Sequence, residues 1–134
     1  MSLQASIATI AVHFSLGQYD QLAARYTYPL PLYLNDEPQV FATPQAFQSF
    51  LERLHKQLTG DGLQQLEGNL VSVELTRCQR FRVWADWTIR GANGHQTVMQ
   101  SISFNSGSHK ERRTEMIQFV VTPAIAAKVE LNAA

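Results

Sequence analysis

The 134-residue sequence predicts an α+β domain, in which three N-terminal helices pack against one face of a mainly antiparallel sheet. Over residues 3–58, apolar residues recur at spacings of three and four, which is typical of amphipathic helices. From Leu70 onward, apolar and polar residues alternate, which is typical of strands with one buried face. Helices that precede a run of strands generally cover one side of an antiparallel sheet.

The first two helices are predicted on either side of Gly17, a residue that commonly ends a helix. Before it, an apolar stripe consists of Leu3, Ile7, Ile10 and Phe14. After it, residues 19–25 form a short second helix with Leu22 turned inward. Pro29 and Pro31 then favour an extended segment over residues 28–34, because proline lacks a backbone donor and restricts the residue before it.

The third helix begins where Thr43 precedes Pro44, a hydroxyl cap followed by a proline at the first helical position. A turn over residues 35–38, rich in Asn and Asp, comes before it. Gly60 and Gly62 end the helix. Its predicted buried face contains Phe47, Leu51, Leu54 and Leu58.

Four strands are predicted in the second half of the chain, joined by tight connections at residues 91–94 and 105–108. The strands cover residues 70–78, 81–90, 95–104 and 112–122. The sequence contains no internal repeat, low-complexity tract or linker. We therefore expect residues 1–134 to form a single domain.

Composition excludes several classes of protein. Hydrophobic residues make up 45% and charged residues 16%, with 11 basic and 11 acidic side chains, so the chain is neither disordered nor a generally basic nucleic-acid-coating protein. No stretch reaches the roughly 20 apolar residues of a membrane helix. The lone Cys78 excludes an internal disulfide, and no two histidines have the spacing of metal ligands. We expect no metal, no cofactor, no nucleic-acid or membrane partner, and a cytoplasmic location.

Charge is distributed unevenly along the chain. Residues 1–76 hold three basic and seven acidic side chains, whereas residues 77–113 hold seven basic and two acidic ones. The positive strand region could steer an anionic ligand, or it could pair with the acidic first half of the same or a neighbouring subunit.

The two faces of the predicted sheet differ in chemistry. One face is nearly all apolar and contains Phe81, Val83, Ala85, Trp87, Ile89, Val98, Gln100, Ile102, Phe104, Ile117, Phe119 and Val121. The other face is mixed and contains Arg82, Trp84, Asp86, Thr88, Arg90, Thr97, Met99, Ser101, Ser103, Thr114, Met116, Gln118 and Val120. In one arrangement the helices cover the apolar face and solvent meets the mixed one. In the other, the mixed face lines a cavity under the helices and the apolar face is buried against a second subunit.

The order of these elements resembles the nuclear transport factor 2-like fold, which ketosteroid isomerases, scytalone dehydratase and SnoaL-like polyketide cyclases share. The resemblance covers about residues 5–122. It is carried by the helix–Gly–helix opening VHFSLGQYD at residues 12–20, the helix start TPQAF at 43–47, and the strands DWTIRG at 86–91 and SISF at 101–104.

The resemblance implies a cone, in which the sheet curves around an interior pocket and its outer face makes a homodimer. It implies that the mixed face lines the pocket, so we adopt the second arrangement. The expected pocket residues are Phe14, Tyr28, Trp84, Met99, Ser101, Ser103, Met116 and Gln118.

The sequence departs from the family's catalytic pattern. The Asp that isomerases and cyclases use on the strand over residues 102–104 corresponds to Ser103 here. The oxyanion Tyr of the first helix corresponds to Ile10, and the base Asp after the second helix falls near Leu34. Ketosteroid isomerase chemistry is therefore not expected.

Asp86 is the candidate catalytic residue, because a carboxylate enclosed by Trp84 and Met99 would suit proton transfer. Its alternative role is an ion pair with Arg82 or Arg90. Tyrosines near the two prolines are candidate hydroxyl donors, since a tyrosine can place its ring in a core and its hydroxyl in a cavity. These tyrosines are Tyr26, Tyr28 and Tyr33.

We therefore expect a homodimeric protein that binds a small hydrophobic or amphipathic molecule. Any reaction would be a lyase, isomerase or hydratase step by proton transfer, with Asp86 as the base and Tyr28 or Gln118 orienting the substrate. The alternative is a non-catalytic accessory or dimerisation module whose sheet docks a partner.

Overall fold

The computed structural model describes residues 2–60, 62–76, 78–91, 94–107 and 112–121, and it confirms the predicted α+β class. Its helices are α1 (Leu3–Ser15), α2 (Tyr19–Ala23) and α3 (Pro44–Gly60). Its strands are β1 (Leu30–Leu34), β2 (Glu37–Phe41), β3 (Leu63–Leu75), β4 (Arg80–Gly91), β5 (Gly94–Ser106) and β6 (Arg113–Val121).

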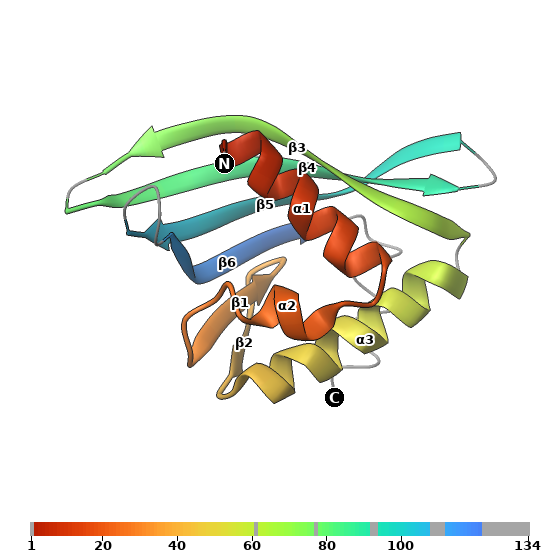
Figure 1. The fold of residues 1–134 in the computed structure, drawn as a ribbon, viewed down its shortest axis with the longest axis horizontal. Coiled ribbons are helices and arrows are strands. Elements are labelled where there is room, and N and C mark those ends of the chain that lie inside the picture. The colour runs from red at the N-terminus through yellow and green to blue at the C-terminus, as the bar shows by residue number, and fades with distance from the viewer. Residues whose placement is uncertain (1, 61, 77, 92–93, 108–111, 122–134) are drawn as a thin grey trace.

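The strands form a single sheet in the order β2-β1-β6-β5-β4-β3. Neighbouring strands are antiparallel except β1 and β6, which are parallel. Figure 1 shows β3 to β6 as a long curved wall that α1 crosses, with α2 and α3 lying together beside β1 and β2. The helices therefore cover one face of the sheet, which we call the inner face, and leave the outer face open.

Hydroxyl caps begin two of the helices, and of these Thr43 was predicted and Ser2 was not. The Ser2 hydroxyl accepts a hydrogen bond from the backbone N–H of Ala5 at 3.1 Å, and the Thr43 hydroxyl accepts one from Ala46 at 3.2 Å. Gly17 has a φ of +72° just after α1, a conformation that glycine adopts without steric cost.

The main differences from the prediction are the start of one strand and the presence of another. β3 begins at Leu63 rather than at residue 70, and the prediction missed its first residues because bulges between residues 63 and 65 and between 70 and 72 interrupt the alternation. β2 was not predicted, since it contains Pro38. It lies at the sheet edge, where a proline costs no ladder hydrogen bond.

Cross-strand pairing decides which side chains share the inner face. Val83 of β4 lies opposite Ser103 of β5, and Trp87 lies opposite Met99. On the next strand Ile117 lies opposite Ser103. The inner face consists of Phe81, Val83, Ala85, Trp87, Ile89, Met99, Ser101, Ser103, Asn105, Ile117 and Phe119.

The adopted arrangement, with the mixed face under the helices, is therefore wrong for β4 and β6 and correct for β5. The predicted division of the strand residues into two faces failed because it depends on the register between strands. The alternation within a single strand does not reveal that register, which places the odd-numbered residues of β4, β5 and β6 on one side. A hydroxyl fits this core because the Trp87 indole N–H donates to Ser101 Oγ at 2.8 Å.

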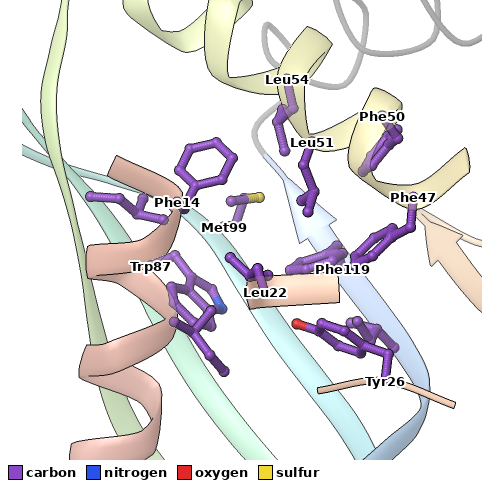
Figure 2. A pocket seen from close by; sticks show the side chains of 13 residues that line it. Phe14, Leu22, Tyr26, Phe47, Phe50, Leu51, Leu54, Trp87, Met99 and Phe119 are labelled. Atoms are coloured by element: carbon purple, nitrogen blue, oxygen red, sulfur yellow. The ribbon is translucent and has the colours of Figure 1, made fainter. Parts of the chain in front are cut away.

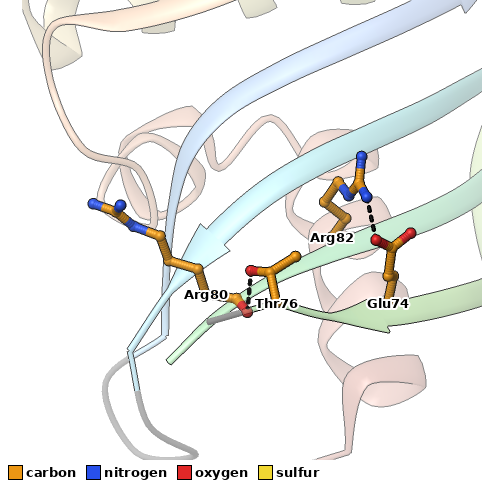
Figure 3. A network of polar contacts seen from close by, with 4 residues as sticks. All are labelled: Glu74, Thr76, Arg80 and Arg82. Carbon is orange, nitrogen blue, oxygen red and sulfur yellow. Dashed lines mark hydrogen bonds and ion pairs between the residues drawn. The ribbon is translucent and has the colours of Figure 1, made fainter. Parts of the chain in front are cut away.

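The arginines of β4 pair with glutamates across the strands. Figure 3 shows Arg82 reaching Glu74 of β3, and the Thr76 hydroxyl donating to the Arg80 carbonyl. Arg90 and Glu67 also pair, at 3.5 Å. The positive strand region thus pairs with the acidic first half of the same chain, although such exposed pairs contribute only about 0–1 kcal/mol each.

Candidate functional site

A cavity of about 60 Å³ lies between the three helices and the inner face of the sheet, and we call it the apolar cavity (Figure 2). Its walls come from all three helices, the segment after α2, and strands β3 to β6. The lining residues are Ile10, Phe14, Leu22, Tyr26, Phe47, Phe50, Leu51, Leu54, Leu66, Trp87, Met99, Ile117 and Phe119. Nearly every group that faces a molecule bound there is aliphatic or aromatic.

Tyr26 supplies the exception. Its side chain is buried, and its hydroxyl has no hydrogen-bond partner among the described residues. Figure 2 shows its oxygen pointing inward, toward the side where Leu22 and Trp87 lie. Burial raises the pKa of Tyr26 well above its usual range, and the charge of Arg25 offsets this only in part. The hydroxyl therefore stays protonated and is available as a hydrogen-bond donor.

Backbone and ring contacts hold Tyr26 in place. Its ring meets that of Phe47 edge-on, with 4.9 Å between centroids. Its carbonyl accepts a hydrogen bond from Arg113 Nη2 at 2.9 Å, and the next residue, Thr27, donates its N–H to the Thr114 carbonyl at 2.8 Å. These bonds tie the segment after α2 to the start of β6.

Phe14 is held against the cavity by a pair of polar side chains. The His55 ring lies 4.8 Å from the Phe14 ring, and the Tyr19 hydroxyl lies 2.5 Å from His55 Nδ1. Burial lowers the pKa of His55 and raises the pKa of Tyr19, with Glu52 adding to the second shift. The imidazole is therefore neutral at pH 7.

A second cavity, of about 70 Å³, lies on the other side of Ile10, and we call it the polar cavity. It is bounded by the first half of α1, by Arg25, and by the neighbouring ends of β4, β5 and β6. Its lining residues are Leu3, Ser6, Ile7, Ile10, Arg25, Phe81, Val83, Ser103, Asn105, Arg112 and Thr114. Ile10 lines both cavities, so its side chain lies between them.

No protein-family model matches the sequence, and no curated protein is similar to it in sequence. Solved structures are similar to it in fold. A domain of unknown function with a cystatin-like fold from Nostoc punctiforme has a TM-score of 0.67 at 9% identity, over 96% of this chain and 83% of that one. A nuclear transport factor 2-like protein with a cystatin-like fold from Novosphingobium aromaticivorans has a TM-score of 0.63 at 12% identity, over 94% and 85%. The chain has the nuclear transport factor 2-like fold.

A third structure with this fold comes from Catenulispora acidiphila and was solved in complex with S-DNPA. It has a TM-score of 0.64 at 9% identity, over 90% of each chain. At sequence identities of 9% to 12%, these similarities show a shared fold and do not show a shared function. The site of this chain is therefore assigned from its own residues.

Five of the eight predicted pocket residues lie on the helix side of this fold. Phe14 and Met99 line the apolar cavity, and Ser103 lines the polar cavity. Ser101 is buried behind Trp87, as its hydrogen-bond acceptor.

Tyr28 lies near the apolar cavity without lining it. Its hydroxyl donates to the Ala23 carbonyl at 2.7 Å. Burial raises the pKa of Tyr28 to about 12, against an opposing effect of Arg113. A hydroxyl already committed to a backbone carbonyl is a poor candidate for orienting a ligand.

Trp84, Asp86, Met116 and Gln118 lie on the outer face, so their predicted placement in the pocket is wrong. Each alternates with an inner-face residue of its own strand, and none lines either cavity. Asp86 lies opposite Asn69 and Gln100, so the aromatic enclosure expected of a general base is not formed under the helices.

The prediction missed most of the apolar wall. Tyr26 was among the candidate hydroxyl donors, and the missed lining residues are Leu22, Phe47, Phe50, Leu51, Leu54, Leu66, Trp87, Ile117 and Phe119. The apolar stripes of α2 and α3 and the apolar alternation of β4 carried the necessary signal. The helix stripes predict core, whereas the apolar face of β4 was predicted to lie in a subunit interface; in the structure both belong to the core, and the cavity is a part of that core left unfilled.

Among the described residues, no group of three His, Cys, Asp or Glu side chains is placed to hold a metal ion. Within the same ranges, no helix has the length and apolar character needed to cross a bilayer.

Proposed function

We propose that this protein binds a small, mainly hydrophobic molecule in the apolar cavity. The observation that carries the proposal is a cavity with apolar walls and one hydroxyl, on the buried side chain of Tyr26, that has no partner among the described residues. A buried polar group left unpaired costs about 1–3 kcal/mol. A ligand with one acceptor atom would offset that cost, whereas a purely apolar filler would not.

The size of the cavity limits the ligand. Its volume is about 60 Å³, and an apolar protein cavity of about 150 Å³ takes up benzene. A ring-sized ligand therefore requires movement of wall side chains. Met99, which is unbranched and adaptable, and Leu54, which is half-buried, are the lining residues best suited to move.

The proposal is for binding rather than for catalysis. Among the described lining residues of the apolar cavity there is no carboxylate and no histidine. Asp86, the predicted base for a lyase, isomerase or hydratase step, lies on the outer face. The complex of the Catenulispora acidiphila protein with S-DNPA supports ligand binding by this fold.

Benzene titration followed by isothermal calorimetry tests the proposal. We expect saturable binding to the unmodified protein, and at least a tenfold loss of affinity in Leu54→Trp, whose indole would fill the cavity. Leu16→Trp is the matched control, because Leu16 is 66% exposed at the end of α1 and lines no cavity. Equal binding by the two variants, or no benzene binding at all, would contradict the proposed function.

We further propose that the outer face mediates homodimerisation, as expected of the dimerisation module that was the alternative function predicted from the sequence. Its support is a cluster of half-buried side chains on the centre of that face, formed by Trp84, Ile102, Phe104 and Met116. The apolar face of β4, on which the dimer was first predicted, lies under the helices instead.

Light scattering distinguishes the dimer from a monomer. We expect a mass near twice that of the chain, and a shift toward the monomer in Trp84→Glu but not in Leu16→Glu. A monomeric unmodified protein would contradict the proposal.

We propose a cytoplasmic location. Its support is that the sequence contains a single cysteine and therefore no internal disulfide, the bond typical of oxidising compartments.

A further inference from the structure

We infer that the polar cavity beside Ile10 binds the anionic head group of an amphipathic ligand, namely a carboxylate attached to a short apolar chain. The inference rests on the proposed function, because it takes the chain of that ligand to occupy the apolar cavity. Three observations support it: the direction of a hydrogen-bond chain, an arginine without a partner among the described residues, and the side chain of Ile10, which lines both cavities.

The hydrogen-bond chain ends on the hydroxyl of Ser103. Thr114 Oγ1 donates to Asn105 Oδ1 at 2.7 Å, and Asn105 Nδ2 donates to the carbonyl and to Oγ of Ser103, both at 3.0 Å. An amide oxygen only accepts and an amide nitrogen only donates, so this chain has one direction. Ser103 Oγ is its last acceptor, and the hydroxyl proton of Ser103 has no acceptor among the described residues. That proton is available to a bound group.

Arg25 supplies a positive charge to the same cavity. Its side chain is half-buried, and within the described ranges its guanidinium makes no ion pair or hydrogen bond. Arg112 also lines the cavity, and no Asp or Glu is among the described lining residues. The described lining thus presents hydroxyl donors and the positive charge of Arg25 without a carboxylate. Arginine and hydroxyl donors that converge in this way suit a carboxylate, whose two oxygens accept several hydrogen bonds.

Ile10 connects this head-group site to the apolar cavity. Its side chain lies between the two spaces, so a ligand whose chain displaces Ile10 would have its head near Arg25 and its tail among the aromatic rings. The two environments are opposite in character, one with charged and hydroxyl donors and the other with apolar walls. An amphipathic molecule matches both, whereas an inorganic anion would leave the apolar cavity empty.

Hexanoate and hexanamide test the inference, because they share a chain and differ in the charge of the head. Dissociation constants are measured at pH 7 by chemical-shift changes in ¹H–¹⁵N spectra. We expect hexanoate to bind the unmodified protein about tenfold more tightly than hexanamide, the effect of a charge-assisted hydrogen bond. Arg25→Gln should remove the preference, Arg25→Lys should keep part of it, and Ser103→Ala should reduce it.

Arg53→Gln is the matched control, because Arg53 is exposed on α3 and lines neither cavity. It should leave the preference for hexanoate unchanged. Equal affinity for hexanoate and hexanamide would overturn the inference. An equal loss of the preference in Arg25→Gln and Arg53→Gln would also overturn it, because general charge rather than a site would then attract the acid.

Benzene separates the two proposals, since it has no head group. If benzene binds and the hexanoate preference is absent, the proposed function stands and the head-group site is wrong. If benzene does not bind while an Arg25-dependent preference persists, the apolar cavity is wrong as a binding site and the anion site stands.

Discussion

Replacing Tyr26 with phenylalanine should stabilise the protein, whereas removal of the hydroxyl from a buried, hydrogen-bonded tyrosine destabilises a protein. The substitution keeps the ring that contacts Phe47 and removes the hydroxyl of a buried side chain, which has no partner among the described residues. An unpaired buried polar group costs about 1–3 kcal/mol, so we expect the free energy of unfolding to rise by about 1 kcal/mol. For a chain of 134 residues the unfolding entropy is about 0.3 kcal/mol/K, which makes the expected rise in Tm roughly 3–4 °C.

Tyr28→Phe is the matched control, because it makes the same chemical change at a tyrosine whose hydroxyl is bonded. The Tyr28 hydroxyl donates to the Ala23 carbonyl at 2.7 Å, and its loss should lower the free energy of unfolding by about 1 kcal/mol. Urea unfolding followed by circular dichroism measures both variants. If Tyr26→Phe is destabilised as much as Tyr28→Phe, the Tyr26 hydroxyl has a partner, and the reasoning that led from it to a ligand is refuted.

Three further predictions concern the packing around the site. Gly68→Ala should destabilise the protein by about 1–3 kcal/mol in urea unfolding, because an added Cβ would lie 2.7 Å from the Trp87 ring; an unchanged midpoint would contradict that close approach. Ser101→Ala should cost a similar amount, since it leaves the buried Trp87 N–H unpaired, and a neutral result would show that the N–H has another acceptor. Burial lowers the pKa of His55 from 6.5, so on acidification the histidine of the unfolded chain is protonated before that of the folded protein. The free energy of unfolding should therefore fall as the pH drops below about 6.5. His55→Gln should remove that part of the pH dependence, and an unchanged pH profile would contradict it.

The helices were predictable because their signals are local. Ser2 was not singled out as a cap, but Thr43, Pro44 and Gly17 mark helix ends through hydrogen bonds and backbone conformations of a few neighbouring residues. The early start of β3 was not predictable in this way. Its bulges break the alternation, and only pairing with β4 makes residues 63–69 a strand.

The sheet face was harder to predict because it depends on register. Each strand shows which of its residues share a side, but not how that side aligns with the next strand. The serines of β5 lie under the helices as predicted, where Ser101 accepts a hydrogen bond from Trp87 and Ser103 takes part in a network with Asn105. Their polarity led the prediction to group them with the polar residues of β4 and β6, whereas the register places them beside apolar ones.

The cavities could not be predicted from the sequence. The apolar cavity forms because large side chains from three helices and four strands fail to fill the space between them, which is a property of packing in three dimensions. Only single members of its wall, Phe14 and Met99, were among the predicted pocket residues.

The central claim is that the ligand site lies under the helices and not on the outer face, and two methionines test it most directly. Met99 lines the apolar cavity, and Met116 lies on the outer face of β6. In a protein labelled with ¹³C at its methionine methyl groups, benzene should shift the Met99 signal to saturation and leave the Met116 signal in place. A shift of Met116 without a shift of Met99 would contradict the claim.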